Sequence, residues 1–522
     1  MTSTLPAWLD PLPDAAAQRA LDRWAIEQRG VAGLELMERA AAGLARIVEE
    51  RCPAGTIAIV CGRGNNGGDG LAAARILRNA GREVDIQLLC EPDALRGDAR
   101  VNLDRLPGAP PRPFNPGTML DARGIVDAIL GTGASGAPRG LVADAIDSVA
   151  LAFSRACNVV ACDVPSGVDA STGEIAGSAV RAHATATFSA GKPGLWISPG
   201  KDQAGEVFVV SIGIPVGERP AEGAARIGLI DGRVLDELPT RGAGATKFEG
   251  GSVLVCGGST GLTGAPSLAS EAAMRAGAGY VTALVSASLH TIFEQRLVEV
   301  MSVPLPDDDG VLVEAALPTV LERCARADAL VLGPGLSRDA GEFARAVAAH
   351  APVPLLLDAD GLNAHAGQLS LLAARTHPTV LTPHGGELAR LLGVENDEVR
   401  AHRLALARRA AREANAVVVL KGDDTIVASP DPDAPVAVSR GGAAVLATAG
   451  TGDVLSGVIG ALLARGVEPF TAACAGVELH RRAGRLVAER LGGPEGAIAR
   501  DVIEALPLAR SAPRLAASHH GQ

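Results

Sequence analysis

Short apolar runs, most of them followed by glycine, alternate with helical stretches along almost the whole chain. In the first part of the chain the apolar runs lie at residues 56–61, 84–89, 124–130, 159–162 and 207–212, and helical stretches lie at 13–50, 71–79 and 141–153. Such runs are typical of strands that are buried on both faces, because the intervening helices cover both sides of a parallel sheet. The pattern predicts an α/β fold.

The same alternation resumes after residues 215–226, a segment rich in proline, glycine and charge that is typical of a linker. The later apolar runs lie at 252–256, 280–285, 329–332, 354–357, 379–381, 416–420 and 425–428. A chain of 522 residues is long enough for two or three compact cores. We therefore expect two α/β domains, residues 1–220 and 221–510, followed by a disordered tail at 511–522.

Charge and composition exclude several classes of protein. The net charge is −11, and the chain has one tyrosine and no basic stripe, which argues against a nucleic-acid partner. No apolar run approaches the roughly 20 residues of a membrane-spanning helix, which argues against a membrane partner. Eight cysteines without a CxxC pair indicate buried thiols in a reducing compartment. We expect a cytoplasmic protein that acts on small molecules.

A polar, glycine-rich motif (CGRGNNGGDG, residues 61–70) follows the first apolar run. Its glycines allow a ligand to approach the backbone, and a helix that begins near Leu71 would offer free N–H groups to a phosphate. The two asparagines and Asp69 add hydrogen bonds or a cation site; a tight turn with left-handed asparagines is the structural alternative. Asp127 lies near the end of one further expected strand, and Asp163 and Ser166 follow another; the carboxyl ends of parallel strands converge on one crevice.

Four motifs in this half, GNNGGDGL, DAILGTG, DVPSGVDASTG and TFSAGKPGL, resemble the NAD(P)H-hydrate epimerase domain. The resemblance covers about residues 15–215 and implies a Rossmann-like three-layer α/β/α domain. It implies a substrate, NADHX or NADPHX, that is hydrated at C6 of the nicotinamide ring. The implied substrate contacts are Asn65, Asn66, Gly67, Gly68, Asp69, Gly131, Thr132, Gly133, Ala134, Ser135, Gly136, Ala137 and Asp163. The resemblance also implies a potassium ion near Asn66, Asp127 and Ser166, whose oxygens suit a hard cation.

Epimerisation breaks and remakes the bond between C6 and oxygen, which calls for a group that moves a proton to and from the leaving water. Asp163 is our candidate for this general acid and base. Lys192, one of only four lysines in the chain, lies in the fourth motif of the resemblance. A lysine is retained where a compact ammonium is needed, in a chain that otherwise uses arginine.

The second half contains the motif ATAGTGDVLSG (residues 447–457), a glycine-rich turn that leads into an apolar helix. The backbone N–H groups at such a helix start form an anion hole. Asp453 would then be a base that takes a hydroxyl proton while the amides stabilise a transferring phosphate. The structural alternative is that Asp453 only caps the helix.

The GTGD motif resembles the phosphoryl-transfer site of the ribokinase-like fold, and further motifs match its ADP/ATP-dependent NAD(P)H-hydrate dehydratase branch over about residues 240–485. The implied substrate contacts are Ala265, Gly335, His384 and Asp453, and the implied nucleotide contacts are Lys421, Gly422, Asp423, Asp424, Thr425 and Gly452. The chain departs from the family pattern at Thr246, Gly385 and residues 443–445. The resemblance implies ADP with Mg²⁺ as the phosphoryl donor. Phosphorylating the C6 hydroxyl would turn it into a good leaving group.

The leading hypothesis is a bifunctional enzyme that epimerises the R and S forms of NADHX and NADPHX. The same enzyme dehydrates the S form at the expense of ADP, giving AMP and phosphate. One alternative is a ribokinase-type small-molecule kinase fused to a dinucleotide-binding domain, which would release a stable phosphorylated product. Another is that the first domain is a non-catalytic binding or scaffolding module. We also expect a homo-oligomer, and the sequence leaves the choices of ADP or ATP and of NADHX or NADPHX open.

Overall fold

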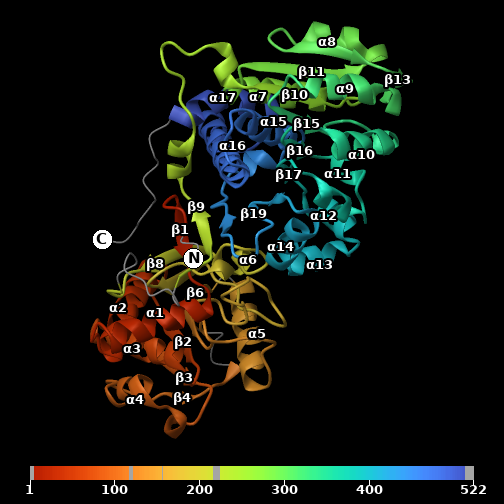
Figure 1. Cartoon of the computed structure of the whole chain (residues 1–522). Helices are drawn as coiled ribbons and strands as arrows, with labels where there is room; N and C mark the ends of the chain where they lie inside the picture. The colour runs from red at the N-terminus through yellow and green to blue at the C-terminus, as the bar shows by residue number, and fades with distance from the viewer. Residues whose placement is uncertain (1–4, 117–121, 156, 215–223, 512–522) are drawn as a thin grey trace. The chain divides into compact units, whose positions relative to one another are not determined.

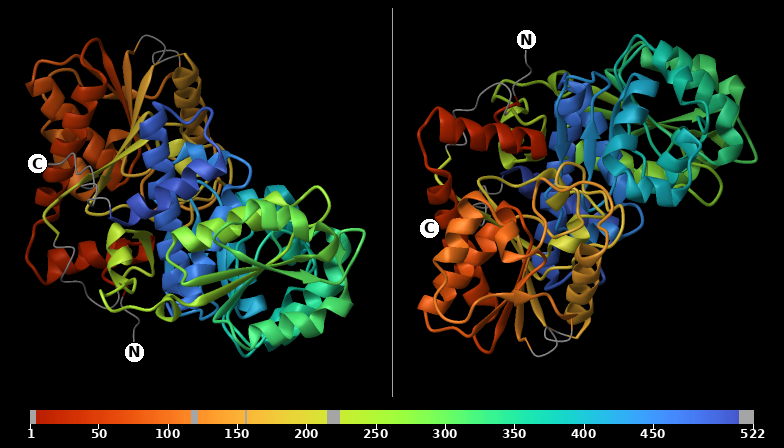
Figure 2. Two further views of the ribbon diagram at one scale, coloured as in Figure 1. Left: turned by 90° about the horizontal axis from the view of Figure 1, so that it is seen from above. Right: turned by 90° about the horizontal axis from the view of Figure 1, so that it is seen from below.

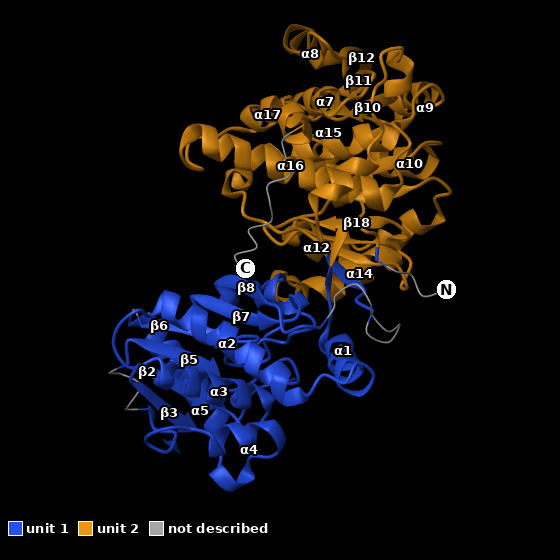
Figure 3. Cartoon of the chain, turned by 90° about the vertical axis from the view of Figure 1, so that its left-hand side faces the viewer, with its two compact units in different colours: residues 1–5, 11–228, 516–522 blue, residues 6–10, 229–515 orange. Residues whose placement is uncertain are grey.

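The computed structural model describes residues 5–116, 122–155, 157–214 and 224–511 (Figure 1). The chain divides into two compact units, coloured separately in Figure 3. The first contains Pro11–Gly228, and the second contains Leu229–Leu515 together with Pro6–Asp10. The expected linker overlaps residues 215–223 and the expected tail overlaps 512–522, which lie outside the described residues. The domain boundary at residue 220 therefore stays a prediction.

Seven parallel strands form the sheet of the first unit, in the order β4-β3-β2-β5-β6-β7-β8. The strands are β2 (Ile57–Cys61), β3 (Val84–Leu88), β4 (Arg112–Pro113), β5 (Gly124–Ala128), β6 (Asn158–Cys162), β7 (Ala184–Phe188) and β8 (Glu206–Val210). From β2 to β4 successive strands are added toward one edge of the sheet, and from β5 to β8 they are added toward the other edge. The order therefore switches direction between β2 and β5. In open parallel sheets such a switch point opens a crevice at the carboxyl ends of the strands, where ligands bind.

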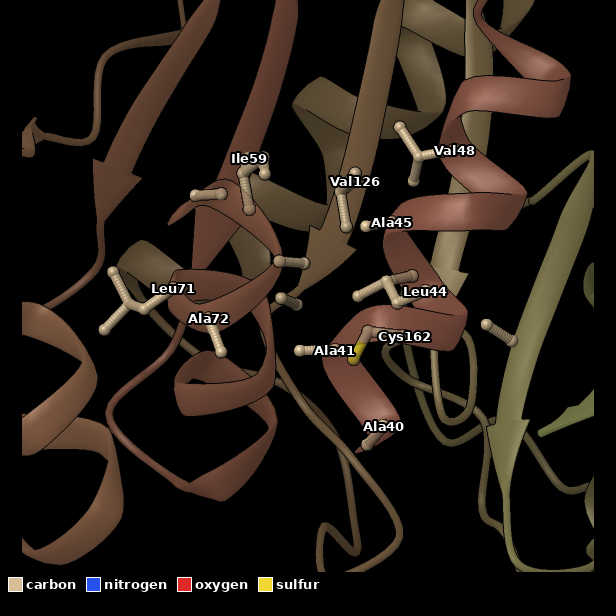
Figure 4. Close-up of a cluster of buried hydrophobic side chains, with 14 of the residues drawn as sticks. Ala40, Ala41, Leu44, Ala45, Val48, Ile59, Leu71, Ala72, Val126 and Cys162 are labelled. Carbon is tan, nitrogen blue, oxygen red and sulfur yellow. The ribbon is translucent and has the colours of Figure 1, made fainter. Parts of the chain in front are cut away.

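Helices cover both faces of this sheet, as expected for strands that are buried on both sides. They are α1 (Ala15–Glu27), α2 (Gly33–Arg51), α3 (Asn65–Asn79), α4 (Gly97–Asp104), α5 (Leu141–Ser154) and α6 (Lys201–Ala204). Alternate residues of β2 point to opposite faces: Ile59 joins the core with α2 and α3 that Figure 4 shows, whereas Val60 joins a second core with α5. The expected three-layer α/β/α arrangement is confirmed for this unit.

Helix α3 begins at Asn65, six residues before the helix start near Leu71 that the sequence predicts. Glycine disfavours helices, so the glycine-rich motif is expected to be a loop. Packing explains the difference. A Cβ on Gly70 would lie 2.6 Å from the Cβ of Ala128, and one on Gly67 would lie 1.9 Å from the carbonyl oxygen of Gly62. These glycines therefore allow the helix start to lie directly against the sheet, and tertiary packing overrides propensity.

An eleven-stranded mixed sheet forms the second unit, in the order β1-β9-β20-β19-β18-β17-β16-β15-β10-β11-β12. Its strands are β1 (Leu9–Leu12), β9 (Ile227–Ile230), β10 (Ser252–Cys256), β11 (Tyr280–Ser286), β12 (Met301–Leu305), β15 (Ala329–Leu332), β16 (Leu355–Leu357), β17 (Thr379–Leu381), β18 (Val417–Leu420), β19 (Ile426–Ala428) and β20 (Val436–Val438). The block from β12 to β18 is parallel, and β19 and β20 continue it antiparallel. A short ribbon of β13 (Asp307–Asp308) and β14 (Val311–Leu312) forms a separate sheet.

Two groups of helices flank this sheet. Figure 2 shows the sheet between the two groups. One group contains α7 (Gly264–Arg275), α15 (Thr451–Ala464), α16 (Pro469–Leu491) and α17 (Ala499–Ser511). The other elements are α8 (His290–Arg296), α9 (Leu317–Cys324), α10 (Gly341–His350), α11 (Asp360–Asn363), α12 (Gly385–Leu392), α13 (Asn396–Ala401) and α14 (Arg403–Ala414). The α/β class that the sequence predicts for both halves is confirmed.

Two further expectations concern membranes and thiols. Within the described ranges, none of the helices combines the length and the apolar character that crossing a bilayer requires. The eight cysteines are all free, and seven of them are buried, whereas Cys90 is partly exposed. Burial of most of these thiols agrees with the sequence, which indicates core cysteines.

Candidate functional site

A cavity of about 920 Å³ opens in the first unit beside the carboxyl ends of β2 and β5. The segments that line it with polar groups include the start of α3, the turn after β5, the residue after β6, and α1. This is the switch point of the strand order, where a doubly wound sheet places its ligand. The fold therefore brings together the strand ends that the sequence singled out.

Asp163 lies at the centre of this polar lining, directly after β6. Its backbone has a φ of 66°, a left-handed conformation that is uncommon for residues other than glycine. One carboxylate oxygen accepts a hydrogen bond of 2.6 Å from Nζ of Lys192, and the other accepts one from the hydroxyl of Thr132. Burial alone would raise the pKa of Asp163, but the charge of Lys192 and these hydrogen bonds hold that pKa below its usual value. The carboxylate is therefore ionised at neutral pH.

Lys192 lines the cavity, but its ammonium is bound to groups of the protein itself. Its side chain is 1% exposed. Its three donors point to Asp163, to Oγ1 of Thr187 at 2.9 Å and to the carbonyl oxygen of Phe188 at 2.8 Å. Because an ammonium has three donors, this set leaves none for a substrate. Lys192 is a positioning residue for Asp163.

A second carboxyl group lines the same cavity, and its pKa is shifted in the opposite direction to that of Asp163. Asp69 on α3 is partly buried, and this burial raises its pKa well above the usual value, with the negative charges of Asp163 and Asp22 adding to the rise. Asp22 on α1 also lines the cavity, and burial raises its pKa as well. The cavity therefore contains one carboxyl group whose pKa is lowered and one whose pKa is raised, an arrangement that suits acid–base chemistry.

The three residues implied for potassium, Asn66, Asp127 and Ser166, lie around the backbone of Leu130. The side-chain amide of Asn66 donates to the Leu130 carbonyl oxygen at 2.9 Å, and the hydroxyl of Ser166 donates to Asp127 at 2.6 Å. Oδ1 of Asn66 is buried and has no hydrogen-bond partner among the described residues. Burial raises the pKa of Asp127 to about 6, against the hydrogen bonds from Ser166 and the backbone of Ile129. The structure thus brings the three residues together and leaves one buried oxygen free.

Only part of the substrate set implied for this unit lines the cavity. The lining members are Asn65, Asn66, Asp69, Gly131, Thr132, Gly133, Ala134 and Asp163. Gly67 and Gly68 are absent from the lining, because they pack α3 against the sheet and against Met37. Ser135, Gly136 and Ala137 also fall outside the lining, and their contact with substrate stays a prediction.

In the second unit, Asp453 lies in the first turn of α15, after the left-handed Gly450 with its φ of 89°. A Cβ at Gly450 would lie 2.7 Å from Leu268, so the turn requires glycine for space as well as for conformation. The first N–H groups of α15 have no acceptors within the helix. Burial raises the pKa of Asp453 to about 7, with Asp358 adding to the rise and Lys421 opposing it. A carboxylate with this pKa suits a general base at neutral pH.

Lys421 is the cation nearest to this helix start. Its Nζ lies 2.9 Å from Oδ1 of Asp358 and 3.7 Å from Oε2 of Glu387, two carboxylates that are almost fully buried. The hydroxyl of Ser456 donates to the other oxygen of Asp358 at 2.7 Å. A Cβ on Gly452 would lie 3.5 Å from the Lys421 ammonium. The ammonium therefore lies beside the N-terminus of α15, where an anion would meet positive charge from both.

A cavity of about 280 Å³ lies next to this ammonium. Lys421, Gly422, Asp423, Thr425 and Gly452 all line it, as the resemblance implies for nucleotide contacts. Asp424 is outside the lining, because its carboxylate pairs with the guanidinium of Arg403 at 2.8 Å in a buried position. Asp424 is thus placed to hold Arg403, and its contact with nucleotide stays a prediction.

The remaining substrate residues of this unit lie on separate loops. A Cβ on Gly335 would lie 3.3 Å from the Cβ of Ala265, so these two residues face each other. His384 caps α12, where its Nδ1 accepts hydrogen bonds from the backbone of Gly386 at 3.0 Å and of Glu387 at 3.3 Å. Its side chain is 54% exposed. His384 therefore performs the structural role of a cap and still presents its other ring edge to solvent.

Comparison with known proteins gives matches in both units. Residues 253–508 match the family described as NAD(P)H-hydrate dehydratase, and residues 33–194 match the family described as YjeF-related protein N-terminus. The bifunctional NAD(P)H-hydrate repair enzyme Nnr of Moorella thermoacetica is 41% identical over 516 residues, covering 95% of this chain and 96% of its own. The chain belongs to the bifunctional NAD(P)H-hydrate repair enzyme family. The Nnr protein of Escherichia coli is 34% identical, covering 93% of this chain and 91% of its own.

Among solved structures, an ADP/ATP-dependent NAD(P)H-hydrate dehydratase from Bacillus subtilis, co-crystallised with ATP/Mg²⁺, matches at 29% identity. It covers 53% of this chain and 95% of its own, with a TM-score of 0.44. The family resemblance that the motifs predicted is confirmed, and so is a bifunctional NAD(P)H-hydrate repair enzyme.

Several residues of both sites were not predicted from the sequence. In the first unit these are Asp22 and Gln18 of α1, which line the cavity. In the second unit they are the buried carboxylates of Asp358 and Glu387 and the cavity-lining residues His480 and Arg481 of α16. Asp358 and Glu387 lie inside motifs that the sequence already offered. The residues of α1 and α16 are on ordinary amphipathic helices, where a single sequence carries no signal for them.

Proposed function

We propose that the first unit interconverts the R and S forms of NADHX and NADPHX. The observation that carries this proposal is the pair of carboxyl groups in one cavity, with the pKa of Asp163 lowered and that of Asp69 raised. Loss of hydroxide from C6 needs a proton, which Asp69 is placed to donate. The resulting cationic ring is stabilised by the Asp163 carboxylate, which then accepts a proton from the water that adds back on either face. This refines the expectation that Asp163 alone serves as acid and base.

A potassium ion would be held by Asn66, Asp127 and Ser166. The chemistry of these donors fits such an ion, because the buried Oδ1 of Asn66 lacks a hydrogen-bond partner among the described residues and the Asp127 carboxylate is fully buried beside Ser166. Amide, hydroxyl and carboxylate oxygens are the ligands of hard cations. Bound there, potassium would supply positive charge at the turn after β5, which carries the cavity residues Gly131 and Thr132.

We further propose that the second unit dehydrates the S form with ADP as the phosphoryl donor. Asp453 takes the proton of the C6 hydroxyl, whose oxygen attacks the terminal phosphoryl group, and AMP leaves. The ring nitrogen then expels phosphate by breaking the bond between C6 and oxygen, and loss of a C5 proton restores the dihydropyridine. Lys421 and the N-terminal N–H groups of α15 stabilise the charge of the transferring phosphoryl group.

Magnesium would enter this site with the nucleotide. No group of three or more acidic, histidine or cysteine side chains suited to a metal ion is found within the described part of the chain. Magnesium characteristically uses one or two carboxylates and binds the substrate phosphates. It would neutralise phosphate charge, while the protein supplies Lys421, the helix start and the base Asp453.

Incubation of the purified protein with mixed epimers of NADHX, Mg²⁺ and either ADP or ATP tests both proposals. We expect recovery of NADH, followed by its absorbance, with release of AMP and phosphate when ADP is supplied. A stable phosphorylated nicotinamide product would indicate a kinase instead. Faster recovery with ATP than with ADP would contradict the choice of donor. Asp453→Asn should stop recovery, whereas Asp69→Asn should restrict it to the S fraction.

We also propose that the protein works in the cytoplasm as a homo-oligomer on small molecules alone. The eight free thiols, seven of them buried and none paired, support a reducing compartment. Sedimentation of the purified protein and fractionation of its native cells test the two statements.

A further inference from the structure

The N-terminal segment Pro6–Asp10 belongs to the second unit, although about 200 residues of the first unit follow it in the chain. Strand β1 is the edge strand next to β9, and β9 is followed by β20. The carbonyl oxygen of Trp8 accepts a hydrogen bond of 3.0 Å from the backbone of Asp231. The Trp8 ring is 5% exposed and lies 6.1 Å from the ring of Phe470, at the start of α16. The first unit is thus inserted, in chain order, between two neighbouring strands of the second.

Asp10 at the end of this segment joins two arginines of the second unit. Its Oδ1 lies 2.5 Å from a guanidinium nitrogen of Arg233, and its Oδ2 accepts a hydrogen bond from Arg440. Arg233 is itself held by Asp231 at 2.6 Å. The Asp10 side chain is 38% exposed and that of Arg440 is 28% exposed, so both keep contact with solvent. The carboxylate is a bridge between β9 and the chain that follows β20.

The backbone on either side of Arg440 forms one wall of the 280 Å³ cavity. Ser439, Gly441, Ala443 and Ala444 all line it. This wall is tied to the opposite, lysine-bearing wall by two hydrogen bonds: Ser439 N donates to the Thr425 carbonyl at 2.8 Å, and Gly442 N donates to Asp423 at 2.7 Å. Gly441 and Gly442 both have positive φ, so the wall has little intrinsic stiffness. The guanidinium of Arg440, fixed by Asp10, is the side-chain anchor of this wall.

We propose that Asp10 is a positioning residue of the nucleotide site: through Arg440 it holds residues 439–444 in the shape that binds ADP. The proposal rests on the proposed function of this cavity as the nucleotide site. Because the ion pair is partly exposed, its loss changes global stability little. The wall that it anchors touches the nucleotide, so its loss acts on nucleotide affinity instead. The N-terminal segment is therefore part of the dehydratase, although it precedes the epimerase in the chain.

Steady-state kinetics of the full-length Asp10→Asn variant test this inference, with pure S-NADHX, Mg²⁺ and varied ADP. We expect the KM for ADP to rise about three- to tenfold, kcat to change less than twofold, and epimerisation to keep its wild-type rate. Asp10→Glu, which retains the carboxylate, should largely restore the KM. Glu413→Gln is the matched control, because it removes a similarly exposed pair with Arg409 at 2.8 Å on α14, where neither partner lines the cavity.

A double-mutant cycle identifies the route. If Asp10 acts through Arg440, then Asp10→Asn combined with Arg440→Gln should raise the KM no further than the larger single effect. An unchanged KM in Asp10→Asn, or equal effects of Asp10→Asn and Glu413→Gln, would overturn the inference. Calorimetric titration of the same variants with ADP and Mg²⁺ gives a readout that is independent of turnover. If wild type neither binds nor uses ADP, the proposed nucleotide site itself is wrong, which separates that failure from failure of the Asp10 inference.

Discussion

Asp163 and Asp453 are both partly buried carboxylates, yet their neighbours shift their pKa values in opposite directions. The ammonium of Lys192, 2.6 Å from Asp163, outweighs burial and lowers the pKa of Asp163. Asp453 has no cation at that distance among the described residues, so burial and Asp358 raise its pKa to about 7. At neutral pH the resting form of Asp163 is therefore the carboxylate, whereas Asp453 titrates near neutrality.

The dehydration rate should therefore follow the ionisation of Asp453. A general base must be deprotonated, so kcat/KM should fall about tenfold per pH unit below pH 7 and level off above it. Initial rates with pure S-NADHX and ADP, measured from about pH 5 to pH 9, check this. Asp453→Asn should lose about 10²–10⁴-fold in rate at every pH. A flat profile in wild type would contradict the assignment of Asp453 as the base.

Stability separates this role from that of a helix cap. Because the folded-state pKa of Asp453 lies above the ordinary value, the folded protein binds more protons than the unfolded chain between about pH 4 and pH 7. The native state therefore loses stability as pH rises through that window. Asp453→Asn should be more stable than wild type by about 2–4 kcal/mol at pH 8 and equal to it at pH 4. A cap would give destabilisation at both pH values.

Lys192→Met tests the charge that holds Asp163. Without the ammonium, burial alone governs the carboxyl, so the pKa of Asp163 should rise. We expect epimerisation at pH 7 to fall about 10²-fold and to recover partly as pH increases. Dehydration of pure S-NADHX should keep its wild-type rate. Lys201→Met, at another lysine of the same unit outside the cavity lining, is the control. Unchanged epimerisation in Lys192→Met would mean that Asp163 does not need its partner.

At the scale of residues, the sequence predicts the site residues that lie in motifs. It does not predict the side chains that these residues contact. Asp163, Asp453 and Lys421 follow apolar runs or precede helices, so strand ends and glycine turns reveal them. The contact of Lys421 with Asp358 joins segments 63 positions apart, and its distance of 2.9 Å depends on the fold. The raised pKa of Asp69 depends on burial that the packed helix start of α3 creates.

At the scale of elements, Gly385, which departs from the family pattern, lies at a position that suits proline. It is the first residue of α12, after His384 with φ −79° and ψ 171°. A Cβ there would find its nearest neighbour, Val399, at 3.8 Å. Proline is favoured at the first helical position, and an extended residue before it is compatible with the ring. Gly385→Pro should therefore stabilise the protein by about 0.4–1 kcal/mol, because it restricts the unfolded chain.

Denaturant unfolding of Gly385→Pro against wild type measures this gain. Gly393→Ala at the other end of α12 is the opposing control, because Gly393 has a φ of 65° that alanine adopts with strain. We expect the second variant to lose about 1 kcal/mol. A loss of stability in Gly385→Pro would mean that the loop before α12 needs the freedom of glycine.

Elements were predicted best where apolar runs are long. The expected strands of both halves appear within one or two residues of their predicted positions, for example at β2, β10 and β18. Strand β7 was missed, because its sequence, ATATF, consists mostly of small and hydroxyl-bearing residues. The start of α3 was misplaced, because helix propensity penalises glycines that packing requires.

At the scale of the whole molecule, two α/β units were predictable because the apolar alternation stops and resumes. The place of β1 was not predictable. It pairs with β9, more than 200 positions later, and no local pattern reports a pairing across that separation. Each unit carries its own cavity and its own proposed acid–base group. The two chemistries can therefore be disabled one at a time.

This separation leads to a prediction about mixed epimers. A site that places one C6 hydroxyl beside Asp453 cannot place the hydroxyl of the other epimer equally well, and near-attack geometry alone can be worth roughly 7–11 kcal/mol. The dehydratase should therefore accept only the S form. Asp163→Asn, given mixed epimers and ADP, should show a fast phase that consumes the S fraction and then a slow phase at the spontaneous epimerisation rate. Wild type should convert the whole mixture without that break. If the two progress curves overlay at matched enzyme concentration, assays on each purified epimer decide between two causes: R consumed directly means that the dehydratase lacks stereoselectivity, and R converted first to S means that Asp163 is not required for epimerisation.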